Sequence, residues 1–189
     1  MKINNSFDVP IEANAALDVL TDVTIVAPCV PGVELTENLD GRKFSGNASV
    51  RLGPVALTFS GEAEILEVDK TTYTAKVFAK GADKKGRGGA EANVSFKLTN
   101  VDGNTRVDVE TDLELSGSIA QYGRASGLIE GVAQQIIEQF ADELRQVLSG
   151  RVVGSPRQEI SGMKVLFRAI FVKFSALFTR KAKVSKEES

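Results

Sequence analysis

The residue types that do most nucleophilic and acid–base chemistry are almost missing from this chain. Its 189 residues include no histidine and one cysteine, Cys29. Ser-His-Asp and Cys-His catalysis and histidine-ligated zinc are therefore excluded, and no disulfide can form within the chain. No base stands beside Cys29 in the sequence, so we expect a small buried residue there rather than a nucleophile. The sequence predicts no catalytic residue and no metal site.

Two other stretches contain the residue types of a phosphate-binding loop or of an acid–base pair, but not in the spacing that such sites require. Residues 81–88, GADKKGRG, begin like a phosphate-binding loop but lack the Lys-Ser/Thr ending, and they join two predicted strands rather than opening a helix. We therefore expect a mobile surface loop with basic side chains at Lys84, Lys85 and Arg87. The carboxylates of Arg106–Leu115 alternate with apolar residues, which predicts the solvated face of a strand rather than an acid–base pair.

The C-terminal segment has the pattern of a basic amphipathic helix. Apolar residues from Met163 to Phe178 recur at steps of three and four, and every charge between Ile160 and Val184 is basic. Charges interrupt the apolar residues too often for a membrane span, which needs about 20 mostly apolar residues. Large apolar residues opposite basic ones are typical of a helix that lies in the membrane interface. The residues predicted to bind an anionic membrane surface are Lys164, Phe167, Arg168, Ile170, Phe171, Lys173, Phe174, Leu177, Phe178, Arg180 and Lys181.

Charge is divided unevenly between the two parts of the chain. Residues 1–150 contain 14 Lys and Arg against 22 Asp and Glu, whereas residues 151–189 contain 9 against 3. A basic tail on an acidic body favours an anionic partner for the tail. The body argues against nucleic acid, because its aromatic residues are not interleaved with basic ones. The alternatives for the tail are docking on its own body, dimerisation and recognition by a calmodulin-like partner.

Hydrophobic periodicity predicts an α+β body that would position these residues. A strand over Met1–Pro10 is followed by a short helix and by a helical turn near Thr24–Ala27. The chain then runs to Gly117 as strands joined by tight turns, which implies an antiparallel meander. A long helix over Gly123–Ser149 must cover the apolar face of the sheet. We therefore expect a domain over residues 1–150, a flexible linker over residues 151–161 and an amphipathic tail helix over residues 162–189.

The predicted inward face of the sheet is uncharged and apolar, but it is built from small residues. Alternation along the strands directs Gly61, Ala63, Ala90 and Ala92 inward. Because protein interiors are close-packed, small side chains under one helix can leave an apolar cavity. The alternative is a strongly curved sheet on which the helix sits close, so that small residues fit without a gap.

Three separated motifs resemble one known family. They are Pro28-Cys-Val-Pro-Gly32, Lys85-Gly-Arg-Gly88 and Gly117-Ser-Ile-Ala-Gln-Tyr-Gly-Arg124. Their types and order are similar to those of the CoxG family (the CoxG subunit of carbon monoxide dehydrogenase), in the START-like (SRPBCC) superfamily. The resemblance covers residues 1–150. The tail resembles the family only in kind, since many members carry a C-terminal membrane-binding extension of variable sequence.

The resemblance implies a helix-grip fold, in which an antiparallel sheet wraps around a long C-terminal helix and encloses an apolar cavity. It also implies a non-enzymatic accessory protein of a molybdenum-containing carbon monoxide dehydrogenase or related hydroxylase. The protein would recruit this enzyme to the membrane. We expect no covalent cofactor. An isoprenoid quinone, such as menaquinone or ubiquinone, is the expected ligand and would link the enzyme to the respiratory chain.

The cellular location and the cavity residues follow from the same interpretation. The N-terminal residues have no apolar core of a signal peptide, so we expect a cytoplasmic protein attached peripherally to the inner face of the cell membrane. The alternatives are a membrane tether with an empty cavity, a START-like lipid-binding protein for another hydroxylase, and an enzyme of the superfamily. The residues expected to line the cavity are Val50, Phe59, Val77, Val94, Phe96, Val109, Val132 and Ile136, with Gln121 and Tyr122 as hydrogen-bonding groups at its mouth.

Overall fold

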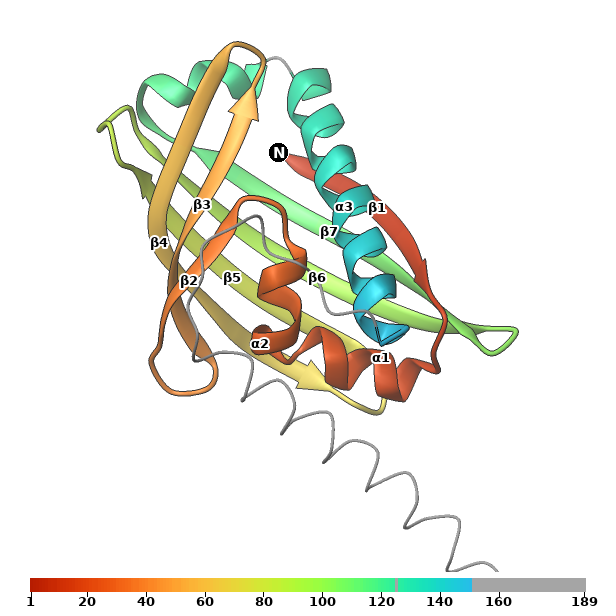
Figure 1. Cartoon of the computed structure of the whole chain (residues 1–189). Helices are drawn as coiled ribbons and strands as arrows, with labels where there is room; N and C mark the ends of the chain where they lie inside the picture. The colour runs from red at the N-terminus through yellow and green to blue at the C-terminus, as the bar shows by residue number, and fades with distance from the viewer. Residues whose placement is uncertain (125, 151–189) are drawn as a thin grey trace, which may run out of the picture. The chain divides into compact units, whose positions relative to one another are not determined.

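Seven strands form one antiparallel sheet in the order β1-β7-β6-β5-β4-β3-β2. A computed structural model of the chain describes residues 1–124 and 126–150 (Figure 1). Neighbours in the chain are neighbours in the sheet, except that β1 pairs with β7, so the meander expected from the tight turns is confirmed. The elements are β1 (Lys2–Val9), α1 (Ala13–Leu20), α2 (Val23–Val26), the 3₁₀ helix η1 (Ala27–Cys29), β2 (Val33–Asn38), β3 (Lys43–Leu52), β4 (Val55–Asp69), β5 (Thr74–Asp83), β6 (Gly89–Val101), β7 (Asn104–Leu115), the 3₁₀ helix η2 (Gly117–Arg124) and α3 (Ser126–Leu148).

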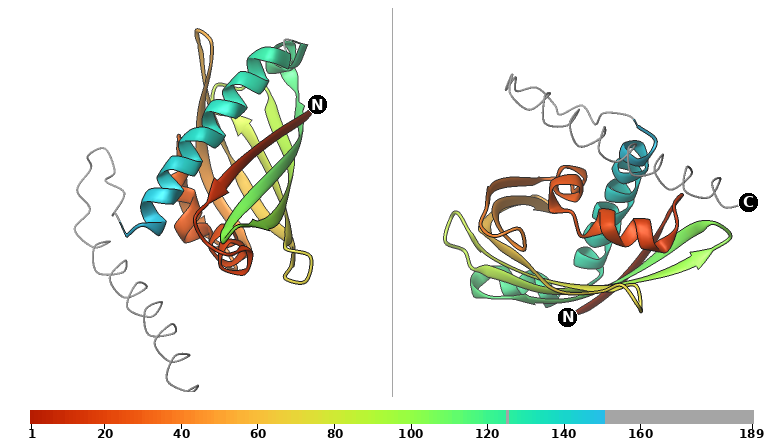
Figure 2. Two further views of the ribbon diagram at one scale, coloured as in Figure 1. Left: turned by 90° about the vertical axis from the view of Figure 1, so that its right-hand side faces the viewer. Right: turned by 90° about the horizontal axis from the view of Figure 1, so that it is seen from below.

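The long helix α3 lies in the concave side of the curled sheet (Figure 2). Its backbone approaches β1 closely and stays apart from the middle strands of the sheet. Phe140 on α3 meets Phe7 on β1 edge to face, with ring centroids 5.5 Å apart. This contact belongs to the main hydrophobic core, which also contains Leu17 of α1 and Leu144 of α3. The sheet therefore wraps around the C-terminal helix as expected.

The two ends of the sheet are built differently. At one end, α1, α2 and η1 pack over the strands, and Leu17 and Cys29 there are almost fully buried. At the other end lie the β3–β4 turn, the β5–β6 turn and η2 (Figure 1). We call these the helix end and the turn end. The helix end is closed by apolar packing between helices and strands. The turn end is covered by the two strand turns, by η2 and by the first turns of α3.

Several boundaries differ from the sequence-based expectation. The long helix begins at Ser126 and not at Gly123, because the preceding residues form η2. The helical turn near Thr24–Ala27 consists of α2 and η1 in succession. Strand β5 continues through Gly81 to Asp83, so the turn consists of residues 84–88 rather than the predicted residues 81–88.

The domain boundaries predicted from the sequence stay predictions. The described residues belong to one compact unit by their internal contacts. The linker over residues 151–161 and the tail over residues 162–189 lie outside the described residues, so both remain predictions. Among the residues that the structure describes, no helix is long and apolar enough to cross a membrane.

Candidate functional site

Two rows of small residues cross the middle of the inward face. Paired residues on neighbouring strands point to the same face of a sheet. The first row runs from Gly46 through Gly61 and Gly81 to Ala90, and the second consists of Ala63, Ala79 and Ala92 on β4, β5 and β6. Every residue of the two rows is half-buried.

The glycines and the alanines occur in these rows for different physical reasons. A Cβ atom on Gly61 would come within 1.9 Å of the Lys80 carbonyl oxygen, and one on Gly46 within 2.7 Å of the Glu34 carbonyl oxygen. The glycines therefore permit the close approach of strands in a strongly curved sheet. The alanines already carry a Cβ atom, and their side chains project less far from the sheet than those of larger apolar residues.

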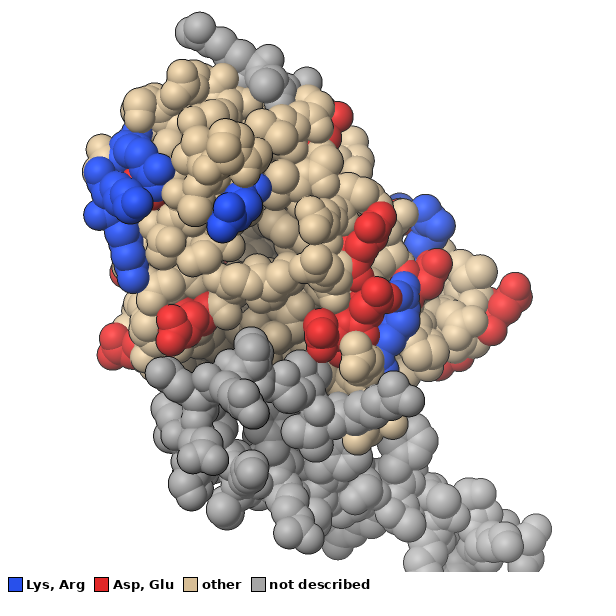
Figure 3. Space-filling model, turned by 45° about the horizontal axis from the view of Figure 1, so that its top comes forward, with Lys and Arg blue, Asp and Glu red and all other residues tan. Residues whose placement is uncertain are grey.

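The N-terminal half of α3 covers the inward face loosely. Phe140 and Leu144 in its C-terminal half are buried. In the N-terminal half Ile129 is buried, whereas Val132 and, near the middle of the helix, Ile136 are only half-buried. Leu128, one turn before Val132, is 39% exposed. Apolar residues that face inward and yet contact solvent indicate a gap that protein atoms do not fill. Uncharged residues dominate the face in Figure 3, which is recessed near its middle; a basic side chain lies beside the recess, and most other charged residues lie further towards the margins.

The predicted cavity residues fall into three groups. Four of them, Val50, Phe59, Tyr122 and Val132, pack around a small buried cluster at the turn end, whose members are Leu52, Leu57 and Ile119. We call this set of seven residues the turn-end cluster. Val94 and Phe96 are half-buried against the main core, in which Val109 is buried. Val77 and Ile136 are half-buried, and Gln121 is exposed. That these residues bind a ligand stays a prediction.

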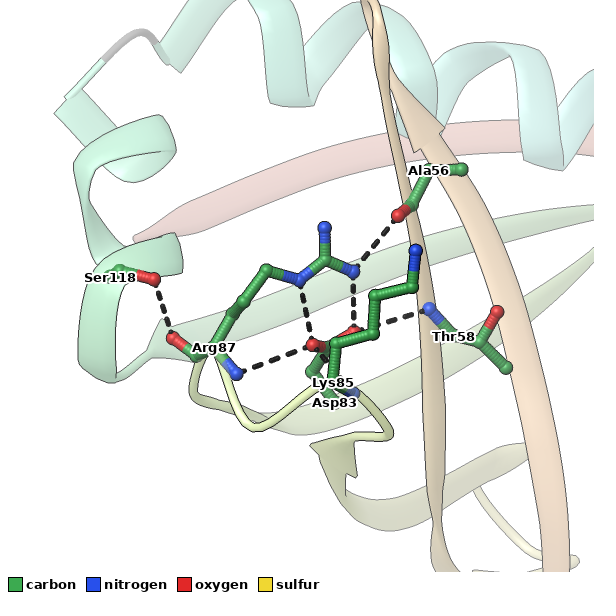
Figure 4. Close-up of polar contacts among 6 residues, drawn as sticks. All are labelled: Ala56, Thr58, Asp83, Lys85, Arg87 and Ser118. Atoms are coloured by element: carbon green, nitrogen blue, oxygen red, sulfur yellow. Dashed lines mark hydrogen bonds and ion pairs between the residues drawn. The ribbon is translucent and has the colours of Figure 1, made fainter.

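An ion pair that the sequence analysis missed lies beside the turn-end cluster. Asp83 pairs with Phe59 across β4 and β5, so it belongs to the inward face. The expectation that this face carries no charged residue is therefore wrong. Arg87 donates from Nε to Asp83 Oδ2 at 2.7 Å and from Nη2 to Asp83 Oδ1 at 2.8 Å (Figure 4). The side chain of Asp83 is 1% exposed and that of Arg87 is 29% exposed. Arg87 is thus part of a fixed structure and not of a mobile basic loop.

Hydrogen bonds to the ionised form set the electrostatics of this pair. The Arg87 guanidinium holds the pKa of the Asp83 carboxyl well below its usual range, and the backbone N–H groups of Arg87 and Thr58 act in the same direction. Asp83 in turn raises the pKa of Arg87, and the nearby Tyr122 contributes a smaller effect of the same sign. Both groups are therefore ionised at neutral pH, and their charges cancel.

The Asp83–Arg87 pair joins three connections at the turn end. Nη2 of Arg87 also donates to the Ala56 carbonyl oxygen of β4 at 2.9 Å. The carbonyl oxygen of Arg87 accepts hydrogen bonds from the backbone N–H and the hydroxyl of Ser118 in η2, each at 2.8 Å (Figure 4). The β5–β6 turn is thereby tied both to the β3–β4 hairpin and to the start of the segment that leads into α3.

The three motifs singled out in the sequence lie along one path of contacts. The second and third motifs meet directly, because a Cβ atom on Gly117 would lie 2.7 Å from the Arg87 carbonyl oxygen. The first motif reaches them through the sheet. Its Gly32 carbonyl accepts the N–H of Ser49 at 2.8 Å, and the Ser49 hydroxyl lies 3.2 Å from that of Thr58. The N–H of Thr58 donates to Asp83 at 3.4 Å.

A pattern in the sequence could have pointed to Asp83. Its carboxylate accepts the backbone N–H groups of Lys85 and Arg87 within the turn. An Asp at the start of a short glycine-rich turn typically accepts such N–H groups. The two glycines flanking it suggested a loop, although Gly81 in fact stands within a strand.

Other candidate sites within the described part of the chain are weaker. Cys29 is 1% exposed, which confirms that it is a buried residue. Residues 1–124 and 126–150 contain no group of three or more His, Cys, Asp or Glu side chains that could hold a metal ion. A groove of about 510 Å³ crosses β4 to β7 among mainly outward-facing residues such as Glu62, Lys80 and Glu91, and it reaches the turn-end cluster only at Leu115, which packs against that cluster.

Comparison with known proteins identifies both a family and a fold. Residues 6–149 match the family described as the CoxG subunit of carbon monoxide dehydrogenase. A search of curated proteins finds no match to the sequence of the chain.

Solved structures resemble the described fold at low sequence identity. A conserved protein from Geobacillus kaustophilus is 20% identical with a TM-score of 0.68, over 79% of this chain and 96% of that one. A protein from Thermus thermophilus is 16% identical with a TM-score of 0.57, over 80% and 100% of the two chains. The Zhui aromatase/cyclase from Streptomyces sp. R1128 is 14% identical with a TM-score of 0.53, over 80% and 99%. At these identities the likeness shows the fold alone, and it confirms the START-like helix-grip arrangement.

Proposed function

Since the chain belongs to the CoxG family of carbon monoxide dehydrogenase subunits, we propose that it is a non-enzymatic accessory protein of a molybdenum-containing carbon monoxide dehydrogenase. In this proposal the body binds an isoprenoid quinone in the apolar space under α3. The basic tail attaches the protein to the inner face of the membrane, from which the quinone is taken. The dehydrogenase would then pass its electrons to this quinone and so to the respiratory chain.

The observation that carries the quinone proposal is the half-burial of inward-facing apolar residues. Ala63, Ala79 and Ala92 lie in one row opposite α3, and Val132 and Ile136 on α3 remain accessible to solvent. An apolar surface left accessible inside a fold costs free energy, which an apolar ligand recovers when it covers that surface. A quinone ring with an isoprenoid chain has the required apolar area and offers carbonyl oxygens at one end.

The described residues also support a role other than catalysis. Acid–base catalysis needs a group whose pKa can be tuned towards neutrality. The charged group that faces the turn-end cluster is Asp83, and its pKa is lowered rather than raised by Arg87. A paired carboxylate of this kind stabilises structure and does not take up protons at neutral pH.

The proposal is tested by organic extraction of the natively expressed full chain followed by mass spectrometry. We expect an isoprenoid quinone in stoichiometric amount. The test includes a matched pair of variants on β5, Ala79→Phe, which fills the inward row, and Ala82→Phe, which adds the same ring at an exposed outward position. Ala79→Phe should lose the quinone and Ala82→Phe should keep it.

Two results would contradict the proposal. If the wild-type protein carries no quinone even after incubation with quinone-loaded liposomes, the space under α3 has another role. If Ala79→Phe retains as much quinone as Ala82→Phe while both variants unfold at the wild-type temperature, the quinone binds elsewhere. A membrane tether that recruits the enzyme without a ligand would then account for the family membership.

A further inference from the structure

We propose that Arg87, held by Asp83, contacts the polar end of the ligand and selects an uncharged oxygen acceptor over a carboxylate or a phosphate. The inference rests on the proposed function, because it concerns the head group of a ligand in the same apolar space. It assigns a specificity-determining residue to this space, and it follows from the donors of Arg87, from its position and from the charge of the pair.

Arg87 has two N–H donors to spare. A guanidinium carries five such donors. Three are used, by the two oxygens of Asp83 and by the Ala56 carbonyl. Neither donor on Nη1 has an acceptor among the residues that the structure describes. In Figure 4 this nitrogen is turned away from Asp83. Either of these two donors can therefore give one hydrogen bond to an oxygen atom of a ligand.

The position of Arg87 places these donors at the boundary of the apolar space. Its partner Asp83 stands opposite Phe59 of the turn-end cluster, on the inward face. On the other side, the Arg87 carbonyl accepts the N–H of Ile119, a buried member of the same cluster, at 3.4 Å. Arg87 is thus connected to the cluster on two sides, through Asp83 and through its own backbone, at the end of the sheet opposite α1 and α2. A ligand with its chain under α3 would present its head group here.

The charge of the pair decides which head group fits. Arg87 alone would attract any anion. Its charge is cancelled by Asp83, whose side chain is buried beside it. A carboxylate or phosphate at Nη1 would lose its hydration and would also be repelled by Asp83. A carbonyl oxygen needs only donors and carries no net charge, so the pair favours a quinone carbonyl over a fatty-acid or phospholipid head group.

The same pair also prepares the donors for binding. A free Arg side chain must give up much of its rotamer freedom when it binds a ligand. Here the fork of Nε and Nη2 is already fixed by Asp83 and Ala56, so the direction of Nη1 is set before the ligand arrives. Less ordering on binding leaves more of the hydrogen-bond energy for affinity.

The experiment compares three probes that share a decyl chain: decylbenzoquinone, decylbenzene and decanoate. Their affinities are measured at pH 7 by displacement of Nile red from the full chain. For the wild type we expect decylbenzoquinone to bind about tenfold more tightly than decylbenzene, as for one hydrogen bond to a charged donor. Arg87→Lys keeps the charge but removes the Nη1 donors, and it should abolish this difference. Asp83→Asn leaves Arg87 uncompensated and should raise the affinity for decanoate about tenfold relative to decylbenzoquinone.

The control variant is Lys85→Met, which removes an exposed charge from the same turn and keeps the backbone N–H that Lys85 donates to Asp83. It should bind the three probes as the wild type does. If the wild type binds decylbenzene as tightly as decylbenzoquinone, or if Arg87→Lys keeps the wild-type difference, the role of Arg87 is overturned while the apolar site stands. If no probe displaces the dye, the apolar site and the role of Arg87 both fail. Should Arg87→Lys not fold, the affinities of the wild type and of Asp83→Asn for the three probes test the role of Arg87. It is overturned if Asp83→Asn binds decanoate no better, relative to decylbenzoquinone, than the wild type does.

Discussion

The carboxylate of Asp83 and the guanidinium of Arg87, four residues apart, face each other through two hydrogen bonds of 2.7 and 2.8 Å. The pair closes the β5–β6 turn on itself and connects it to β4 and η2. The sequence predicted a mobile basic loop here, but the turn is held to its neighbours by these hydrogen bonds. Its stability should depend on pH in a way that can be measured.

Acid should weaken the protein partly through Asp83. The pKa of Asp83 is held below its usual range by Arg87, so the unfolded state binds this proton at a higher pH than the folded state does. The stabilisation is complete above the unfolded pKa of about 3.9 and is lost as the pH falls below it. Urea unfolding at pH 7 and pH 3 should give a smaller difference for Asp83→Asn than for the wild type. Equal differences would show that other carboxylates carry the acid sensitivity.

The helix end should carry most of the stability of the body. Phe140→Ala removes the ring that meets Phe7 edge to face in the main core and should cost about 3–5 kcal/mol of the free energy of unfolding. Leu128→Ala, on the exposed part of the same helix, should change it by less than about 0.5 kcal/mol. Chemical denaturation of the two variants measures both values. A large loss in Leu128→Ala would mean that the N-terminal half of α3 is packed more tightly than its exposure indicates.

The contact between the second motif and the residue just before the third motif should tolerate no added side chain. Gly88 has a φ of +146°, and a Cβ atom there would lie 1.9 Å from the Ser116 carbonyl oxygen. Gly88→Ala should therefore lower the thermal midpoint and release the β5–β6 turn, which hydrogen exchange of the Ser118 amide would report. Gly131→Ala is the control, because nothing lies within 4 Å of the added atom and the residue stands in α3. It should stabilise the protein by about 0.5–1 kcal/mol.

The sequence predicted the local elements better than their partners. Alternation identified β7, but nothing local indicated that β1 would pair with it from Lys2↔Asp112 to Val9↔Thr105. Such pairing depends on contacts between residues far apart in the chain, which periodicity does not report. Asp83 was missed for a related reason. Gly81 suggested a loop, but it lies within β5 and pairs with Gly61 of β4, which the local sequence does not reveal. The small residues of the inward face were identified correctly. Only the folded backbone shows that Gly61 is needed for the close approach of two strands, whereas Ala79 is not a glycine and has another reason to be small.

Cys29 should be unreactive while the protein is folded. Burial, followed by the charge of Glu143, raises the pKa of its thiol from 9.0 to about 11. The thiolate is the reactive form, so very little of it exists at pH 8 in the folded state. A disulfide reagent such as 5,5′-dithiobis(2-nitrobenzoate) should modify about one thiol in urea and almost none under native conditions. Fast modification of the folded protein would mean that the helix end opens readily.

Binding to an anionic membrane should depend on where the positive charges lie and not on their number. In our proposal the basic residues of the tail contact the lipid, so Lys164→Glu, Arg168→Glu and Lys173→Glu together should abolish sedimentation with anionic liposomes. Each basic residue near such a surface contributes about 1 kcal/mol, so losing three weakens binding at least about a hundredfold. The matched control reverses three exposed charges of the body, Arg51→Glu, Lys84→Glu and Lys97→Glu, with the same change in net charge. Since the body is already acidic, this control should reduce binding only slightly. An equal loss in both triple variants would point to net charge, and unchanged binding of the tail variant would overturn the electrostatic attachment.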